Sequence, residues 1–242
     1  MYLALIICIH FQIQQAVKQV FGTNPPENGI FDIPDVCGEQ QSNSFFVDIP
    51  TTQARCDFED GGWWLVVLRR KADVQQQVNF TRKWDDYERG FGDLNTELWY
   101  GLRNIHCLTT REEVELQIEV RQNDGTGQVW TYGYFVVDGP ENNYTLHIGQ
   151  AEGPSDGRDS MAYHNGMQFS TTDRDNDKYS SRNCASYYHG GWWHKSCYYS
   201  LLTGSHTHRR LNWRTRSRSE VYFSYAEMKL RPKRCTSEGS CN

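Results

Sequence analysis

The sequence predicts an α+β fold, with one large domain in which a sheet of short strands supports a long, loop-rich C-terminal region. Three observations predict it. Hydrophobic residues make up 38% of the 242 positions, which is enough for one cooperative core. Short apolar or alternating segments bounded by turn residues recur along the chain. Residues 153–204 are rich in Gly, Ser, Asp and Asn and poor in aliphatic residues, which is typical of loops.

Individual elements follow from periodicity. Thr96 and the apolar positions from Leu98 to His106 have helical spacing and predict a helix. The alternation from Val114 to Val120 predicts a half-buried strand, and residues 122–128 (QNDGTGQ) predict a hairpin turn after it. Further strands are predicted at 44–49, 63–70, 129–137, 143–150 and 220–232, the last of them returning to the central sheet.

The N-terminus has the character of a secretory signal peptide. An apolar run extends from Tyr2 to Ile9, and no charged residue occurs through Ala16, so we predict a signal at residues 1–16. The segment lacks a basic start and has Gln14 where a small residue is preferred, so a misassigned start or a buried strand is the alternative. A Pro-containing linker at 17–36, a domain at 37–233 and a tail at 234–242 follow. Beyond the N-terminus, no apolar run approaches the length of a membrane span.

Cysteine usage agrees with a secreted, extracellular protein. The chain has eight cysteines, one of them inside the predicted signal, with no Cys-x-x-Cys pair and no zinc-like Cys/His spacing. Disulfides are therefore favoured over a structural metal. Seven is an odd number, so one thiol stays free or pairs with another chain. Sequons at Asn79 and Asn143 predict N-glycosylation.

The charge of −5 is unevenly distributed. Residues 209–234 carry nine lysines and arginines against two glutamates. This basic segment is either a solvated strand and loop or a surface for anionic glycans or acidic partners. The absence of a basic excess over the whole chain argues against nucleic acid as a partner.

Three carboxylates occur at alternate positions, at Asp173, Asp175 and Asp177. Two such charges ~6 Å apart repel by roughly 3 kcal/mol at an effective dielectric of about 20. A bound cation, the interleaved Arg174 and Lys178, or simple solvation could offset this repulsion. An EF-hand is excluded, because its sixth and twelfth positions would be Lys178 and Cys184 instead of Gly and Glu.

Several segments together resemble the fibrinogen-related domain, the globular module of fibrinogen chains, ficolins, tachylectins, tenascins and angiopoietin-like proteins. They are GGWWLVVLRR, VNFTRKWDDYERGFGDLNTELWYGLRNIHCLT, SMAYHNGMQFSTTDRDNDKYSSRNCASYYHGGWWHKSC and SEVYFSYAEMKLRP. The resemblance runs from about Cys37 to Pro232 and implies a mixed, mostly antiparallel sheet. It implies the disulfides Cys37–Cys56 and Cys184–Cys197. Three cysteines lie outside the common pattern: Cys107, Cys235 and Cys241. If Cys107 pairs with one of the two tail cysteines, the other tail cysteine is available to link subunits.

The same resemblance implies a Ca²⁺ site. The matching ligands are the carboxylates of Asp175 and Asp177 and the carbonyls of Tyr179 and Ser181. The segment before Cys184 is one residue longer than in many members, so Ser180 or Arg182 could replace Ser181. Oxygen-only ligation suits a hard cation. A solvated acidic loop without metal is the alternative.

Ficolin-like members bind acetyl groups in an aromatic pocket beside this calcium site, and the resemblance carries over in part. Tyr188 matches the pocket tyrosine, and Ser196-Cys197 matches a cis peptide that turns backbone N–H groups toward the ligand. Trp192 and Trp193 match an aromatic pair that core packing explains equally well. Tyr198 replaces the usual histidine, and Thr203 the usual asparagine. The loop that follows is short and lacks the tyrosine that closes the pocket from its far side in the family; Thr207 and His208 lie nearest that position. Further on, Arg216 and Arg218 occupy the positions where a second tryptophan and a glycine are common. These changes are compatible with two ligands. An acetyl group could stack on Tyr188 and Tyr198, or an anionic sugar could be bound by Arg209, Arg210 or His208.

Catalysis has little support, because Asp159, Ser160 and His164 lack a nucleophile elbow. We therefore expect a secreted, calcium-binding, non-enzymatic, lectin-like binder of acetylated or anionic glycans in innate immunity, with avidity from a disulfide-linked or non-covalent homo-oligomer. The alternative is a signalling or matrix ligand that binds a cell-surface protein receptor through the same loops.

Overall fold

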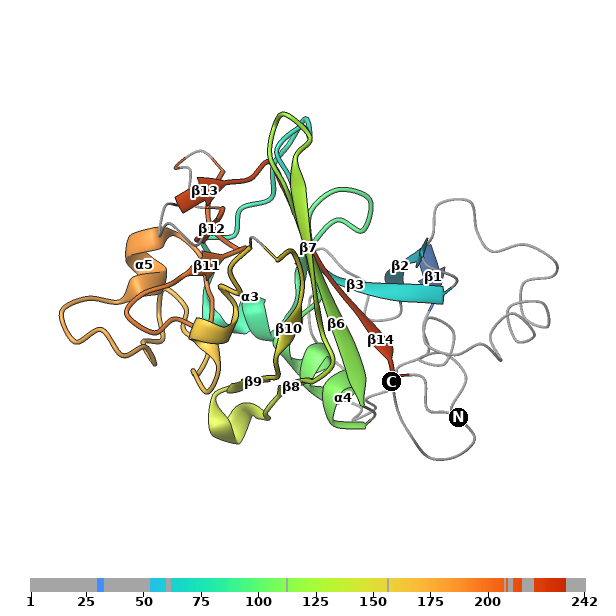
Figure 1. Ribbon diagram of the computed structural model, residues 1–242. Coiled ribbons are helices and arrows are strands. Elements are labelled where there is room, and N and C mark those ends of the chain that lie inside the picture. Colours follow the sequence, from blue (N-terminus) through green and yellow to red (C-terminus); the bar gives the residue numbers. More distant parts are fainter. Residues whose placement is uncertain are drawn as a thin grey trace.

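The computed structural model describes residues 30–32, 53–59, 62–111, 113–155, 157–206, 208, 211–214 and 220–233. The predicted signal, Cys37, the strand at 44–49 and the tail at 234–242 lie outside these residues, as do Thr207, Arg209, Arg210, Arg216 and Arg218. In the described part, one large antiparallel sheet stands beside a loop-rich region with short helices (Figure 1). The α+β prediction is confirmed.

The large sheet has the strand order β1-β2-β3-β14-β6-β7-β10, with β4 and β5 attached to β3 through β5. All its pairings are antiparallel. The strands are β1 (Ile30–Asp32), β2 (Gln53–Glu59), β3 (Gly62–Lys71), β4 (Phe91–Gly92), β5 (Leu98–Trp99), β6 (Val114–Arg121), β7 (Gly127–Tyr132), β10 (Ala151–Glu152) and β14 (Tyr225–Pro232). The first strand, β1, falls within the stretch predicted as a linker.

The closing strand β14 occupies the middle of this sheet, between β3 and β6 (Figure 1). Its alternate residues Ala226, Met228 and Leu230 are buried in the main core. Glu227 and Lys229 point to the opposite face and are also buried, within an ion-pair network. The predicted return of this segment to the central sheet is confirmed. Strand β14 is the partner that β3 and β6 share.

Two segments predicted as single long strands each contain two strands, one of which belongs to a separate small sheet. The predicted strand 129–137 is broken at Gly133: residues after it form β8 (Phe135–Val137), which leaves the large sheet and pairs with β9 (Leu146–Ile148). The predicted strand 220–232 is likewise two strands. Its first part is β13 (Glu220–Tyr222), which pairs with β12 (Asn212–Arg214) and, through it, with β11 (Ser200–Leu201).

The helices are short and lie against the sheets. They are α3 (Trp84–Arg89), α4 (Leu102–Arg111), α5 (Cys184–Tyr188) and the 3-10 turns η1 (Pro140–Asn142) and η2 (Ala162–His164). The predicted helix at 96–106 starts too early, because Leu98–Trp99 is strand β5 and Gly101 adopts a φ of 97° just before α4. Helix α4 holds β8: Thr109 Oγ1 accepts a hydrogen bond from the Val137 amide, and His106 Nδ1 contacts the Val137 carbonyl at 2.8 Å.

Aromatic packing joins the sheet to the loop-rich region. Phe169, in the loops, contacts Trp99 of β5 and Trp193 with ring centroids 5.8 and 5.2 Å apart, and Tyr87 of α3 at 5.2 Å. All four side chains are fully buried. Because each such ring removes a large apolar area from water, this cluster fixes the loops of residues 153–204 against the sheet despite their low aliphatic content.

Candidate functional site

The three aspartates of the acidic loop have different environments. Asp173 is exposed, but its Oδ1 accepts hydrogen bonds from the Trp84 amide at the start of α3 (2.9 Å) and from Thr171 Oγ1 (2.8 Å). Burial opposes ionisation of Asp173, but these hydrogen bonds outweigh it and lower its pKa. Asp173 therefore attaches the loop to helix α3 and has a structural role.

Asp175 and Asp177 form a pair of neighbouring carboxylates. The Asp177 amide donates to Asp175 Oδ1 at 3.3 Å, while the Asp177 carboxylate accepts from the amides of Tyr179 (2.6 Å) and Cys184 (2.8 Å). Burial raises the pKa of Asp177, the two amides lower it, and the neighbouring Asp175 raises it again, with a net upward shift. A positive charge at this point would relieve the repulsion between the two groups.

The donor set fits a hard cation held by two carboxylates and backbone carbonyls. Tyr179 and Ser181 both lie on the exposed side of the loop, and the Tyr179 carbonyl accepts only a long turn hydrogen bond, from the Arg182 amide at 3.4 Å. Within the described residues, no cluster of three or more His, Cys, Asp or Glu side chains could hold a metal. A cation here would therefore depend on carbonyl and water oxygens for the rest of its coordination, as Ca²⁺ permits.

The second disulfide is formed as the resemblance implied, between Cys184 and Cys197. Cys184 starts helix α5, whose N-cap Asn183 accepts a hydrogen bond from the Ser186 amide at 2.8 Å. The Ser196-Cys197 peptide is cis, as predicted. Cys56 and Cys107 are also disulfide-bonded, but Cys37 and the tail cysteines are outside the described residues.

The acidic loop and the segment at Cys197 are connected directly. The Lys178 amide donates to the Lys195 carbonyl (2.9 Å), and the Lys195 amide donates to the Cys197 carbonyl (2.7 Å). The Asp177 carboxylate also accepts from the amide of Cys184, the disulfide partner of Cys197. The acidic loop and the cysteine segment are therefore joined by short hydrogen bonds and by a disulfide.

The structure brings together the two predicted pocket tyrosines. Tyr188, at the end of α5, and Tyr198, next to Cys197, pack edge to face with ring centroids 4.7 Å apart. Tyr198 is only 7% exposed, whereas neighbouring Tyr187 is 49% exposed. His208 is exposed and stacks on His189, the residue that follows α5, at 4.7 Å.

Trp192 and Trp193 are fully buried and pack against each other at 5.1 Å, so core packing accounts for both. His194, between them and the disulfide, was not singled out from the sequence. Burial lowers its pKa to about 4, so it is neutral at physiological pH, and its Nε2 contacts the Gly190 carbonyl. No motif in the sequence distinguishes His194, because it simply follows the two tryptophans.

The Asp159, Ser160 and His164 group is not arranged for nucleophilic chemistry. His164 Nε2 accepts from the amides of Tyr199 and Ser200, and Nδ1 faces the Trp193 carbonyl at 2.7 Å. Ser160 Oγ donates to the Arg214 carbonyl. Burial lowers the pKa of His164 to about 3. Both ring nitrogens are used to hold backbone, which leaves none to activate the serine.

Of the two sequon asparagines, Asn79 is exposed and Asn143 is half-buried, in a left-handed conformation at the end of η1. In the described part of the chain, no helix combines the length and apolar character that crossing a membrane requires.

Comparison with known proteins identifies the fold. The family model for the C-terminal globular domain of fibrinogen beta and gamma chains matches residues 35–233. The chain belongs to the fibrinogen-related family. Human tenascin-R is 40% identical over 186 residues, which are 74% of this chain and 13% of tenascin-R. This fibrinogen-related chain thus spans only a small part of the length of that relative.

Solved structures agree. The fibrinogen-like globe domain of human ANGPTL2 superposes with a TM-score of 0.71 at 30% identity, covering 90% of this chain and 96% of that one. Lamprey fibrin D-dimer, in complex with the peptide Gly-His-Arg-Pro-amide, gives 0.68 at 26% identity, covering 92% and 75%.

Proposed function

We propose that this fibrinogen-related domain is a secreted, non-enzymatic recognition module that binds acetylated ligands next to a Ca²⁺ ion. The observation that supports it most is the continuous connection from the Asp175–Asp177 pair to the Tyr188–Tyr198 pair through the Cys184–Cys197 disulfide. Ca²⁺ would be held by the two carboxylates and by carbonyls at Tyr179 and Ser181. The tyrosine rings, with the backbone around Ser196 and Cys197, would contact the acetyl group, and His208 the remainder of the ligand.

Disulfide bonding supports an extracellular location. Each of the four cysteines in the described residues, Cys56, Cys107, Cys184 and Cys197, is disulfide-bonded. Such bonds persist in oxidising compartments and are rare in the cytosol. We also propose glycosylation at Asn79, which is exposed, and a role in innate immunity.

A protein or peptide ligand is the second candidate. Tyr198 exposes little of its ring, while the adjacent Tyr187 is half exposed and offers an aromatic contact outside any pocket. The lamprey fibrin relative was solved with a bound peptide. An exposed aromatic residue beside a rigid disulfide loop suits such a partner.

The test is retention of the secreted protein on an N-acetylglucosamine resin in the presence of calcium. Elution by both chelator and free N-acetylglucosamine is the expected result. Asp177→Asn should abolish retention, whereas Asp173→Asn should not, because an asparagine Oδ1 can still accept the two hydrogen bonds of Asp173. Absence of retention, together with binding to a cell-surface protein, would instead favour the second candidate. Equal losses in both variants would contradict the assignment of the calcium ligands.

A further inference from the structure

A polar groove of about 750 Å³ lies at one end of the large sheet, where β3 ends, β14 begins and β6 turns into β7. Its volume is within the range of ligand-binding clefts. Four cationic side chains line it, from three strands: Arg55, Arg69, Lys71 and Arg121. Asp73 is the one carboxylate among the described lining residues. None of these residues belongs to the site at the Cys184–Cys197 disulfide.

Strand register places two of the cations on either side of a tyrosine. Tyr225 is paired with Lys71 of β3 on one side and with Arg121 of β6 on the other. Residues opposite one another in a sheet point to the same face, and neighbouring strands are ~4.8 Å apart, so Lys71 and Arg121 flank the ring about 10 Å from each other. The Arg121 guanidinium lies over the Tyr225 ring, 3.9 Å from its centroid.

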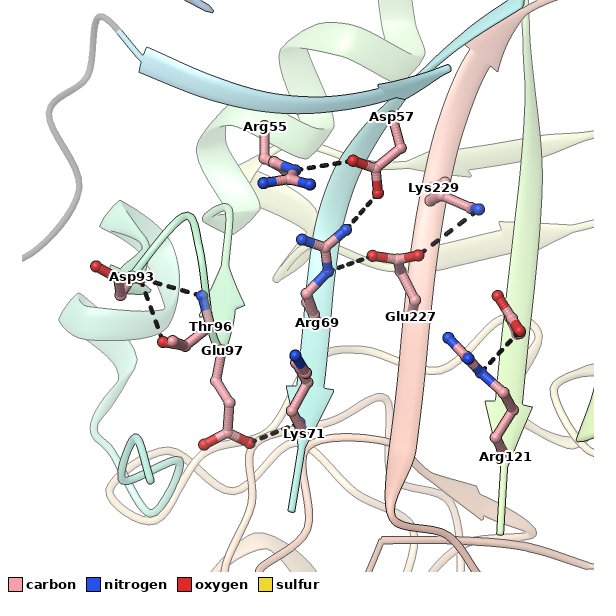
Figure 2. A network of polar contacts seen from close by, with 11 residues as sticks. Arg55, Asp57, Arg69, Lys71, Asp93, Thr96, Glu97, Arg121, Glu227 and Lys229 are labelled. Atoms are coloured by element: carbon pink, nitrogen blue, oxygen red, sulfur yellow. Dashed lines mark hydrogen bonds and ion pairs between the residues drawn. The ribbon is translucent and has the colours of Figure 1, made fainter. Parts of the chain in front are cut away.

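The next row of residues supplies carboxylates to two of the cations: Glu227 pairs with Arg69, and Glu119 pairs with one nitrogen of Arg121. Arg69 is buried and forms ion pairs with both Glu227 and Asp57 (Figure 2). Arg121 uses its Nε for Glu119 at 2.9 Å, but its side chain remains 45% exposed. No carboxylate of the described residues forms an ion pair with the Lys71 ammonium, although the Lys71 amide is bonded to Glu97. Lys71 and Arg121 therefore retain donors that face solvent in the groove.

We propose that this groove binds a sulfated oligosaccharide, with Lys71 and Arg121 contacting sulfate groups on either side of Tyr225. The rest of the lining suits a sugar: Asn95, Gln122, Asn123 and Ser224 supply amides and a hydroxyl for neutral sugar hydroxyls, and Tyr225 supplies a ring. This site is separate from the acetyl site and does not depend on it.

An acidic peptide fits the groove less well. At the groove, β14 and β6 are paired on both sides, and the Lys71 amide at the end of β3 is already bonded to the Glu97 carboxylate, so no free sheet edge is available for an added strand. The described lining residues also include no large aliphatic side chain that would form a pocket for an apolar anchor. Recognition must therefore come from charge and from polar side chains, which a sulfated sugar matches.

The test measures binding of sulfated maltotetraose and of unsulfated maltotetraose by calorimetry, in chelator. Neither sugar carries an acetyl group, so the result is independent of the acetyl site. We expect the sulfated sugar to bind, with an affinity that falls as salt is raised, and the parent sugar to bind at least about tenfold more weakly. Lys71→Gln and Arg121→Gln should each weaken binding roughly fivefold. Lys71→Arg should retain it, and Lys83→Gln, which removes the same charge from an exposed position outside the groove, should leave it unchanged.

Equal binding of the two sugars would overturn the proposal, as would equal affinities of the Lys71→Gln and Lys83→Gln proteins. A hexaglutamate peptide that bound as tightly as the sulfated sugar would show that the groove accepts an acidic peptide, and this too would overturn it. Thermal unfolding of each variant confirms that the fold is intact.

Discussion

Replacing Glu97 by glutamine should destabilise the domain strongly. Glu97 is fully buried just before β5 and accepts hydrogen bonds from four groups: Arg70 Nε (2.9 Å), His206 Nε2 (3.1 Å) and the amides of Val78 (2.8 Å) and Lys71 (3.2 Å). Arg70 also donates to the carbonyls of Leu202 and Gly204. The carboxylate thus holds strand β3, the loop after it and the loop at residues 202–206 together.

The magnitude follows from two independent routes. Burial alone would raise the pKa of Glu97, but the bonds from His206, Arg70 and Val78 lower it to about 2 from an ordinary 4.5. At 1.36 kcal/mol per unit, this corresponds to about 3 kcal/mol of stabilisation. Removing one partner of a buried ion pair costs about 3–5 kcal/mol by comparison with other proteins. Burial lowers the pKa of Arg70 while Glu97 raises it, and because arginine stays charged, Glu97→Gln would leave a buried cation uncompensated.

The assay is urea unfolding at pH 7, with Glu113→Gln as the control. Glu113 is 70% exposed and pairs with Lys233 at 3.4 Å, so its loss should cost less than about 1 kcal/mol. The penalty for Glu97→Gln should also depend on pH. The folded pKa lies below the unfolded one, so the stabilisation is fully present above about pH 4.5 and is lost as the pH falls toward 2. A cost for Glu97→Gln that matched the control, or that did not change between pH 7 and pH 3, would refute this account.

Two further substitutions test the backbone and the covalent link. Gly92→Ala should cost about 3 kcal/mol or more, because Gly92 has a φ of 105° and an added Cβ would lie 2.2 Å from the Glu97 carbonyl oxygen. Gly125→Ala, at a φ of 84° with nothing within 4 Å, should cost only about 1 kcal/mol, and similar costs at the two positions would contradict the steric argument. Replacing both Cys184 and Cys197 by alanine should remove about 3 kcal/mol, because the disulfide spans 13 positions, as measured by urea unfolding. A loss below about 1 kcal/mol would show that the loop is held by its other contacts.

Sequence patterns predicted the long strands well. Strand β6 extends over Val114–Arg121, as its alternation indicated, and the buried run of β3 was equally clear. The pattern failed where two elements share one apolar run. Leu98 and Trp99 have helical spacing with Leu102 and Ile105, but they belong to a strand, because pairing with Arg69 and Leu68 of β3 outweighs local spacing. Which residues pair across the sheet is not encoded in periodicity.

The candidate site was predictable only through the family resemblance. The cis peptide at Cys197, which it implied, is confirmed, and Asp173 accepts a separate hydrogen bond from the Trp84 amide. The assignment of Asp175 and Asp177 as calcium ligands stays a prediction. The polar groove was not predictable, because Lys71 and Arg121 are far apart in sequence and become neighbours only through Tyr225. The basic excess at 209–234 left a cationic surface and a solvated strand and loop both open, and among the described residues of that segment Ser224 and Tyr225 alone line the groove.

The central position of β14 has a consequence for the order of folding. Strands β3 and β6 do not pair with each other; each reaches its main partner only when residues 225–232 insert between them. During synthesis, more than 100 residues that follow β6 must emerge before the two halves of the sheet can join. Until then each of the two strands has one unpaired edge, which is prone to pair with other chains, and slow, non-local strand insertion should limit the folding rate.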